Sequence, residues 1–189
     1  FGLTLEKMKQ QLVESGYVGY IDINCIANGT AIYPLEFTSR FGYPTISIHM
    51  EGVTGEWGRF LHSIAGGENV ALEAKKGFQI GVVIAVPPFP FTDDKTFRKF
   101  SEDATVLFKK PDMAGVHLGE IKKDGSDWRI AGRSGYALVV TGSGITTEEA
   151  RQQAYNRVAN IMIPNMFYRT DIGAKWIKDS DLLLSLGYL

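Results

Sequence analysis

The sequence predicts an α+β fold, and three observations support this prediction. Residues 17–26 and 31–37 are rich in β-branched and aromatic residues and flank Asn28-Gly29, a dipeptide typical of a β-hairpin turn. In the second half of the chain, short strand-like runs alternate with turn residues, as in antiparallel sheets. Other segments place apolar residues at helical spacing. We therefore expect a hairpin with helices, followed by a small mixed domain with a curled antiparallel sheet and a packed helix.

Two helices are predicted in the first half of the chain. The first covers residues 4–15 and places these apolar residues on one face: Leu5, Met8, Leu12 and Val13. The second covers residues 54–65, and its apolar side chains at helical spacing are expected in the core rather than around a ligand: Trp57, Phe60, Leu61 and Ile64.

The second half predicts strands followed by a helix. A strand over residues 77–86 is stopped by Pro87-Pro88-Phe89-Pro90. Shorter strands are expected over residues 105–109, 114–122, 128–131 and 136–141. Thr146-Thr-Glu-Glu149 is a helix start, and the helix should continue to about Ile161 and pack on the sheet. Gly142-Ser-Gly144 before it could hold a phosphate, but it lacks the lysine and spacing of a P-loop, so a plain turn is favoured.

Composition excludes several classes of protein. The 189 residues are 44% hydrophobic, enough for a real core, and 20 basic against 21 acidic residues give a net charge of −1. That balance provides no electrostatic footprint for nucleic acid or anionic lipid. No apolar run approaches the roughly 20 residues of a membrane span, and none resembles a secretory leader.

Cysteine and histidine usage adds little chemistry. The lone Cys25 lies in an apolar run that should bury it, which favours a reducing, cytoplasmic compartment. The three histidines are scattered without ligand spacing, so neither a zinc site nor a Ser-His-Asp site is supported: His49, His62 and His117.

The candidate site lies at the end of the hairpin. Because side chains alternate along a strand, Glu36, Thr38 and Arg40 should share one face, while Leu35 and Phe37 face the core. A carboxylate, a second oxygen and a following arginine suit Mg²⁺ and a phosphorylated group. An exposed strand ending in a polar turn is the alternative, and the residues alone leave both interpretations open.

The register of the hairpin decides whether Asp22 joins this site. A two-residue turn at Asn28-Gly29 would place Ile21 opposite Glu36, whereas a three-residue connection that includes Thr30 would place Asp22 there. Two neighbouring carboxylates would repel unless a cation lay between them.

Three stretches resemble one known family. Leu35-Glu-Phe-Thr-Ser-Arg-Phe-Gly-Tyr-Pro44 resembles the Glu-Phe-Asn-x-Arg-Phe-Gly-Asp-Pro segment of the phosphoribosylamine-glycine ligases, or glycinamide ribonucleotide synthetases, which are ATP-grasp enzymes. Gly135–Gly144 is similar to the family's Gly-Arg-Val-Leu-x-Val-Thr-Ala-x-Gly, and Phe167–Gly173 to its closing Phe-x-Arg-x-Asp-Ile-Gly. Three ordered matches at family-like spacing are far more specific than any one alone.

The resemblance implies a domain organisation. It suggests the carboxy-terminal part of an ATP-grasp catalytic domain over residues 1–72 and the family's final domain over residues 73–189, with an N-terminal portion missing. Thr45–Glu51 would be a substrate-side loop leading to a helix. Arg169 and Asp171 would form a structural pair or contact the preceding fold as in the family, and a catalytic role is less favoured.

The resemblance also implies a reaction and its residues. ATP would phosphorylate the carboxylate of glycine, and the amine of phosphoribosylamine would then displace phosphate to form glycinamide ribonucleotide. Glu36 would bind the nucleotide through Mg²⁺ or Mn²⁺, with Asp22, placed opposite it, and Thr38 as further metal ligands. Arg40 would be catalytic and, with Gly42, would bind substrate.

Departures from the family pattern leave alternatives open. Thr38 replaces an asparagine, Tyr43 an aspartate, Thr45 a glutamate and Tyr136 an arginine, and the family's Gly-Tyr-Pro segment is here the proline-rich run at residues 87–90. An active ligase, a ligase with another substrate, and a catalytically silent relative acting in nucleotide binding or assembly all remain. The piece alone is not expected to turn over. The sequence leaves the amine and carboxylate substrates and the oligomeric state open.

Overall fold

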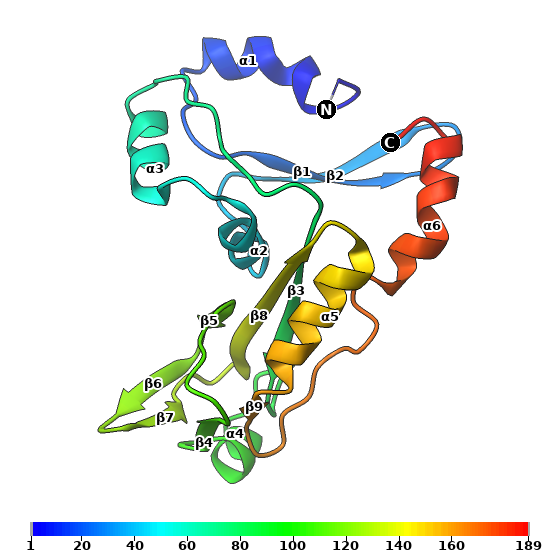
Figure 1. Cartoon of the computed structure of the whole chain (residues 1–189). Helices are drawn as coiled ribbons and strands as arrows, with labels where there is room; N and C mark the ends of the chain where they lie inside the picture. Colours follow the sequence, from blue (N-terminus) through cyan, green and yellow to red (C-terminus); the bar gives the residue numbers. More distant parts are fainter. Residues whose placement is uncertain (1, 189) are drawn as a thin grey trace.

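The computed structural model describes residues 2–188 (Figure 1). The hairpin predicted around Asn28-Gly29 is confirmed. The first part of the chain contains η1 (Leu5–Met8), α1 (Lys9–Glu14), β1 (Asp22–Ala27), β2 (Ile32–Thr38), α2 (Thr45–Gly52) and α3 (Trp57–Ala65). The expected loop over Thr45–Glu51 is wrong, since these residues form helix α2.

The second part forms two antiparallel sheets rather than one curled sheet. Its elements are β3 (Phe78–Ala85), α4 (Asp94–Phe100), β4 (Thr105–Phe108), β5 (Val116–Leu118), β6 (Ile121–Asp124), β7 (Asp127–Ile130), β8 (Tyr136–Gly144), α5 (Thr147–Val158), β9 (Ile161–Met162) and α6 (Ala174–Ser185). The strand orders are β3-β8-β5 and β6-β7-β4-β9. Helix α4 was not predicted, although Asp93 caps its first turn by accepting from the backbone N–H groups of Lys95 and Thr96.

The core lies between the β3-β8-β5 sheet and α5, as predicted. Val82, Ile84 and Leu138 of β3 and β8 are completely buried. Helix α5 begins with a capping box, in which Thr146 and Glu149 satisfy each other's backbone N–H groups. The helix covers the sheet in Figure 1.

The hairpin register differs from both expected alternatives. Asp22 pairs with Thr38, and Asn24 pairs with Glu36, so the expectation of Asp22 opposite Glu36 is wrong. The turn is longer than expected, because Asn28 N–H donates to the carbonyl of Ala31 at 3.0 Å. An irregularity between Asn24 and Cys25 then shifts the pairing by one further residue. Together the two shifts leave Asp22 and Glu36 on the same face.

The opposite face of the hairpin is not part of the core. Leu35 is 62% and Phe37 47% exposed, and Cys25 is exposed as well, so the expected burial of all three is wrong. The predicted N-terminal helix divides into η1 and α1, and neither contains a buried residue. Alternation along a strand defines which side chains share a face, but not whether another layer covers that face.

The aromatic stripe of α3 lines a cavity rather than a closed core. Trp57 contacts Phe41 and Phe60 edge to face, with ring centroids 5.9 Å and 6.0 Å apart. All three residues line an apolar cavity of about 720 Å³, and Leu61 on the same helix is 43% exposed.

The last helix returns the chain to the hairpin. Helix α6 leads to Tyr188, whose hydroxyl donates to the carbonyl of Asn28 at 2.6 Å. In Figure 1 this end of the chain lies beside the hairpin turn.

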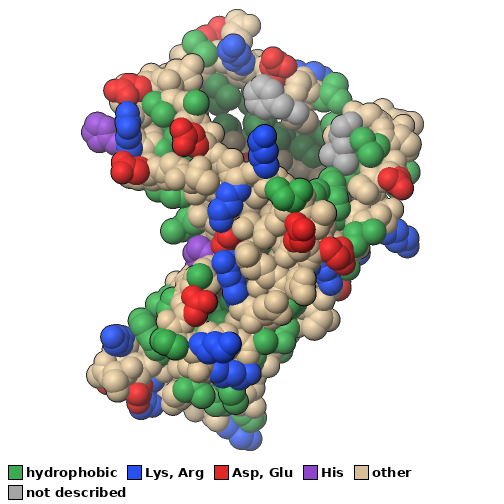
Figure 2. All heavy atoms as spheres, viewed as in Figure 1, with side chains coloured by type: hydrophobic (Ala, Val, Ile, Leu, Met, Phe, Trp, Pro, Cys, Tyr) green, Lys and Arg blue, Asp and Glu red, His purple; other side chains and the backbone are tan. Residues whose placement is uncertain are grey.

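Surface charge is mixed, in keeping with the near-neutral composition. Acidic and basic side chains are interspersed on the face shown in Figure 2. Within residues 2–188, no helix is long and apolar enough to cross a membrane.

The contact between α5 and β8 requires glycine at position 142. A Cβ there would lie 2.5 Å from the backbone nitrogen of Ala154. We expect Gly142→Ala to lower the free energy of unfolding by about 2 kcal/mol, since the helix must move away from the sheet. In the matched control Gly58→Ala, on α3, the new Cβ meets nothing within 4 Å. Urea unfolding of both variants would check this, and equal stabilities would contradict it.

Candidate active site

The predicted site residues gather around one cavity. A space of about 500 Å³ at the open end of the hairpin is lined by Asp22, Asn24, Glu36, Thr38, Arg40, Phe41, Gly42, Tyr43, Thr45 and Tyr136. All five residues expected to act in binding or catalysis are therefore brought together: Asp22, Glu36, Thr38, Arg40 and Gly42. Asn24 is an addition that only the observed register could reveal.

Oxygen atoms dominate the hairpin side of the cavity. Tyr20 donates its hydroxyl to Asp22 Oδ2 at 2.9 Å, and Asn24 Nδ2 donates to Glu36 Oε1 at 3.3 Å. Burial, followed by the bond to Asp22, raises the pKa of Tyr20, so its hydroxyl remains a donor. The other oxygen of each carboxylate accepts no hydrogen bond from the part of the chain that the structure describes.

These oxygen atoms fit a hard cation such as Mg²⁺ whose remaining ligands come from a nucleotide. Magnesium prefers oxygen ligands and usually keeps several waters or phosphate oxygens, so a few protein oxygens suffice. No cluster of three or more His, Cys, Asp or Glu residues suited to a metal occurs in residues 2–188. A metal bound here would therefore depend on Asp22 and Glu36 together with neutral oxygens.

Gly42 lies close to the side chain of Thr45 and at ordinary contact distance from Arg40. A Cβ on Gly42 would lie 3.8 Å from Arg40 Nη1 and 3.3 Å from Thr45 Oγ1. Arg40 is the only positively charged residue that lines the cavity, and it is exposed.

The opposite wall of the cavity is aromatic. Tyr43 and Tyr136 meet edge to face, with centroids 5.0 Å apart and planes at 89°. Phe89 packs against Tyr136 at 4.8 Å. Burial raises the pKa of Tyr43 to about 12, with smaller contributions from Tyr136 and Glu120, so the hydroxyl is neutral near pH 7. Two of the four residues that depart from the family pattern, Tyr43 and Tyr136, thus contact each other.

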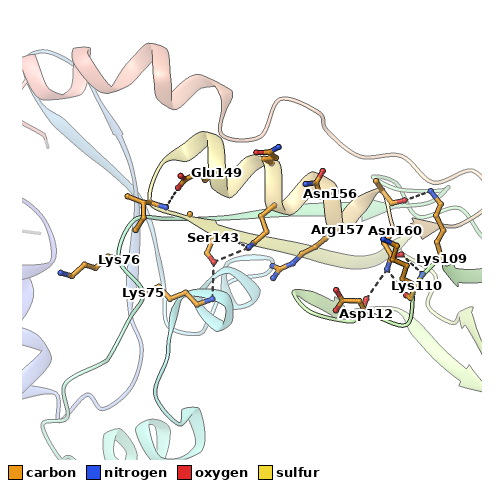
Figure 3. Close-up of a pocket in the computed structure, with 15 residues that line it drawn as sticks. Lys75, Lys76, Lys109, Lys110, Asp112, Ser143, Glu149, Asn156, Arg157 and Asn160 are labelled. Atoms are coloured by element: carbon orange, nitrogen blue, oxygen red, sulfur yellow. Dashed lines mark hydrogen bonds between the residues drawn. The ribbon is translucent and has the colours of Figure 1, made fainter.

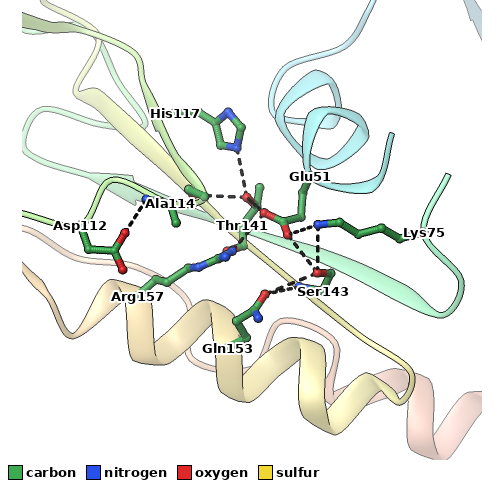
Figure 4. A network of polar contacts seen from close by, with 10 residues as sticks. Glu51, Lys75, Asp112, Ala114, His117, Thr141, Ser143, Gln153 and Arg157 are labelled. Carbon is green, nitrogen blue, oxygen red and sulfur yellow. Dashed lines mark hydrogen bonds and ion pairs between the residues drawn. The ribbon is translucent and has the colours of Figure 1, made fainter. Parts of the chain in front are cut away.

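Helix α2 carries a buried carboxylate that sequence reasoning missed (Figure 4). The side chain of Glu51 on α2 is 7% exposed. Four donors surround it at 2.9–3.0 Å: Lys75 and Ser143 at Oε1, and Thr141 and Arg157 at Oε2. Burial alone would raise the pKa of Glu51, but these donors and the Arg157 charge lower it to about 2.

The Glu51 cluster, meaning Glu51 and its four donors, joins α2 to the second part of the chain. Its donors come from the segment before β3, from β8 and from α5. His117 Nε2 lies 3.0 Å from Thr141 Oγ1. Burial lowers the pKa of His117, Arg157 acts in the same direction and Glu51 opposes it. No spacing in the sequence indicates this cluster, because its members are far apart along the chain.

A larger groove of about 1070 Å³ runs along α5 (Figure 3). Its lining includes four lysines: Lys75, Lys76, Lys109 and Lys110. Lys75 is bonded to Glu51, and Lys109 donates to the carbonyl of Ala159 at 2.6 Å. Asp112 and Glu149 add negative charge, so the groove is of mixed sign.

The glycine turn before α5 is not a phosphate loop. Gly142 and Gly144 belong to strand β8. Glu149 Oε2 accepts from the backbone N–H groups of Ile145 and Thr146 at 2.8 Å and 3.1 Å. Gly142-Ser-Gly144 is thus the end of a strand, and the predicted turn into the helix lies at Ile145 and Thr146 instead. Arg169 and Asp171 also pair as predicted, with two hydrogen bonds of 2.9 Å and 2.6 Å.

The family model and the curated relatives that match this chain indicate one family. The family model "Phosphoribosylglycinamide synthetase, C domain" matches residues 79–175. A phosphoribosylamine–glycine ligase from Corynebacterium ammoniagenes is 30% identical over 177 residues, which cover 89% of this chain and 39% of that protein.

Two solved structures are similar in fold. The phosphoribosylamine–glycine ligase of Thermotoga maritima has a TM-score of 0.67 at 20% identity, covering 90% of this chain and 43% of that one. The biotin carboxylase subunit of a pyruvate carboxylase has a TM-score of 0.55 at 15% identity, covering 95% of this chain and 41% of that one. The chain thus spans about two fifths of the length of the curated relatives that it matches.

Removing the charge of Glu51 should destabilise the protein. Glu51→Gln leaves Lys75 and Arg157 without their counterion, and we expect a loss of about 3 kcal/mol in the free energy of unfolding. Glu56→Gln, at an exposed position before α3, should change it by less than about 0.5 kcal/mol. Urea unfolding at pH 7 measures both, and similar values would contradict the structural role of Glu51.

The Glu51 cluster should also make stability depend on pH. The pKa of Glu51 is lowered from 4.5 to about 2, so its contribution is complete above pH 4.5 and is lost as the pH falls through about 2. The difference in melting temperature between wild type and Glu51→Gln should therefore shrink from pH 5 towards pH 2. A difference that stays constant over this range would disprove the assignment.

Proposed function

The chain belongs to the phosphoribosylglycinamide synthetase family, and we propose that it forms the C-terminal part of an ATP-dependent phosphoribosylamine–glycine ligase. In this proposal the full-length protein joins glycine to phosphoribosylamine through a glycyl phosphate, forming glycinamide ribonucleotide in purine biosynthesis. Residues 1–72 would complete an ATP-grasp catalytic domain, and residues 73–189 would form the family's final domain. The match to residues 79–175 lies within the second of these.

One observation supports the proposal most directly. The stretches at residues 35–44 and 135–144, which separately resemble family motifs, meet at one cavity through Tyr43 and Tyr136. Motifs that come together in space are what a shared active site requires, whereas unrelated surface segments have no reason to meet.

Five residues of the cavity then have proposed roles. Glu36, Asp22 and Thr38 would hold Mg²⁺ or Mn²⁺, which supplies charge neutralisation for the nucleotide phosphates when bound. Arg40 would orient the acyl phosphate by donating to its oxygens, and Gly42 would bind substrate beside it.

Chemistry would proceed in two steps. The glycine carboxylate would attack the γ-phosphorus of ATP with loss of ADP. The acceptor amine would then attack the acyl carbon, forming the amide bond as phosphate leaves. Positioning by the cavity walls would keep the reacting groups in contact.

A catalytically silent relative is the second candidate. The observation that favours it is Thr38, whose side chain offers a hydroxyl in place of the carboxamide oxygen of the family's asparagine. Under the ligase candidate we propose a cytoplasmic protein with ATP and small-molecule ligands and with a preceding portion of the same polypeptide that contributes most of the nucleotide site.

The ligase proposal can be tested in the full-length polypeptide. We expect phosphate release that needs both glycine and phosphoribosylamine, and a loss of about 100-fold in kcat for Glu36→Gln, equivalent to about 2.7 kcal/mol. The control Glu68→Gln, at an exposed position after α3, should keep wild-type activity. Magnesium-dependent ATP binding without release would indicate another substrate. Absence of nucleotide binding would favour the silent relative.

A further inference from the structure

Helix α6 and the residues after it connect the two parts of the chain. The match to the family model ends at residue 175, near the start of α6 (Ala174–Ser185). The helix begins beside α5 and ends at the hairpin turn, as Figure 1 shows. Residues 176–188, which we call the strap, therefore lie beyond the family match and join elements that are far apart in the sequence.

The strap is tied to the core at its first residue. The ring of Trp176 packs against Phe78 of β3, with centroids 5.3 Å apart and planes at 61°. Phe78 itself packs against the buried core. The segment before the strap is held by α5, because the Tyr155 hydroxyl donates to the carbonyl of Arg169 at 2.8 Å and accepts from the backbone N–H of Ile172 at 3.2 Å.

The middle of the strap faces solvent. Ile177, Leu182 and Leu184 are more than half exposed, and α6 contains no buried residue. The position of the helix is therefore determined by the contacts at its two ends.

A Schellman motif ends α6 and turns the chain towards the hairpin. Gly187 has a φ of +72°, the left-handed conformation that glycine favours. Its N–H donates to the carbonyl of Leu184 at 3.0 Å, and the N–H of Tyr188 donates to the carbonyl of Leu183 at 3.0 Å. This local termination brings the side chain of Tyr188 to the turn.

Tyr188 and Leu186 hold the tip of the hairpin. The Tyr188 hydroxyl donates to the carbonyl of Asn28 at 2.6 Å and lies 3.3 Å from the carbonyl of Ala31. Leu186 Cδ2 lies 3.4 Å from the position that a Cβ on Gly29 would take. The turn is well ordered internally, since Asn28 Oδ1 accepts from the backbone N–H of Ala31 at 3.0 Å. A restraint on the turn is therefore passed to both strands.

The hairpin needs such a support. A two-stranded sheet by itself is marginally stable in water. Within residues 2–188, β1 and β2 pair only with each other. Asp22 and Glu36 lie towards the open end and the turn lies at the other, so a tilt of the hairpin moves these carboxylates. Magnesium demands near-ideal octahedral geometry, and a small displacement of its ligands weakens its binding.

We propose that the strap fixes the hairpin, with Tyr188 and Leu186 as positioning residues for the metal ligands at its open end. The restraint of the turn is argued from the contacts alone. The effect on magnesium rests on the proposed function.

Hydrogen exchange, measured by mass spectrometry on the full-length polypeptide, tests the restraint of the turn. The double variant Leu186→Ala/Tyr188→Phe removes the contacts with the turn and retains α6. We expect exchange in a peptide covering residues 26–33 to accelerate about tenfold, since a hydrogen bond and an apolar contact are lost. The matched control is Tyr33→Phe on β2, whose half-exposed hydroxyl makes no hydrogen bond within residues 2–188. Its exchange should match wild type.

Two results would overturn the strap and leave the ligase function standing. One is unchanged exchange over residues 26–33 in the double variant. The other is an equal acceleration in β3 and β8, because this would indicate general destabilisation rather than release of the hairpin.

The magnesium dependence of phosphate release tests the positioning role. With ATP, glycine and phosphoribosylamine present, we expect the free Mg²⁺ concentration at half-maximal rate to rise about threefold or more in the double variant, with kcat at saturating Mg²⁺ within about twofold of wild type. A lower kcat with unchanged Mg²⁺ dependence would overturn the positioning role. Wild type that releases no phosphate would overturn the ligase function and the magnesium effect with it, while the exchange experiment would still decide the strap.

Discussion

The buried carboxylate of Glu51 is the constraint on which the rest of the arrangement depends. Its side chain is 7% exposed, and a lone carboxylate so far removed from water would be strongly unfavourable. Only the arrangement that brings Lys75, Ser143, Thr141 and Arg157 together satisfies it. Apolar burial between β3, β8 and α5 would tolerate α2 in several positions, because hydrophobic contact is non-directional. The directional hydrogen bonds to Glu51 are satisfied in only one position of α2. Because the loop with Arg40 and Tyr43 leads into α2, these bonds also determine where that loop lies.

The candidate site depends equally on the register of the hairpin, because only an even number of one-residue shifts keeps Asp22 and Glu36 on the same face. A shift of one residue turns every side chain of a strand to the other face. The longer turn and the irregularity beside Cys25 are two such shifts, and together they return Glu36 to the face of Asp22. The bulge is therefore part of the site's construction, as bulges beside functional sites often are.

Local signals explain what the sequence could predict. The Asn28-Gly29 turn, the capping box at Thr146 and the strand before the proline run each depend on neighbouring residues, and the structure contains all three. Contacts between distant residues could not be predicted, since Glu51 alone suggests a solvated carboxylate and Tyr136 an ordinary strand residue. The prediction that Leu35 and Phe37 are buried was wrong for another reason. Alternation along a strand does not show whether another part of the chain covers that face. The metal and catalytic roles of Asp22, Glu36, Thr38, Arg40 and Gly42 remain predictions, although the cavity brings all five together.

The bond from Tyr188 to Asn28 spans 160 positions and bears on the order of folding. A hairpin closes within microseconds, but a contact of such long range must wait for loop closure across the chain. During synthesis the turn at Asn28 leaves the ribosome long before Tyr188 exists. The newly made hairpin therefore lacks the hydrogen bond from Tyr188 during this interval. Leu35 and Phe37, which are exposed even in the folded protein, are exposed then as well. An exposed hydrophobic strand surface of this kind is one that chaperones bind during translation.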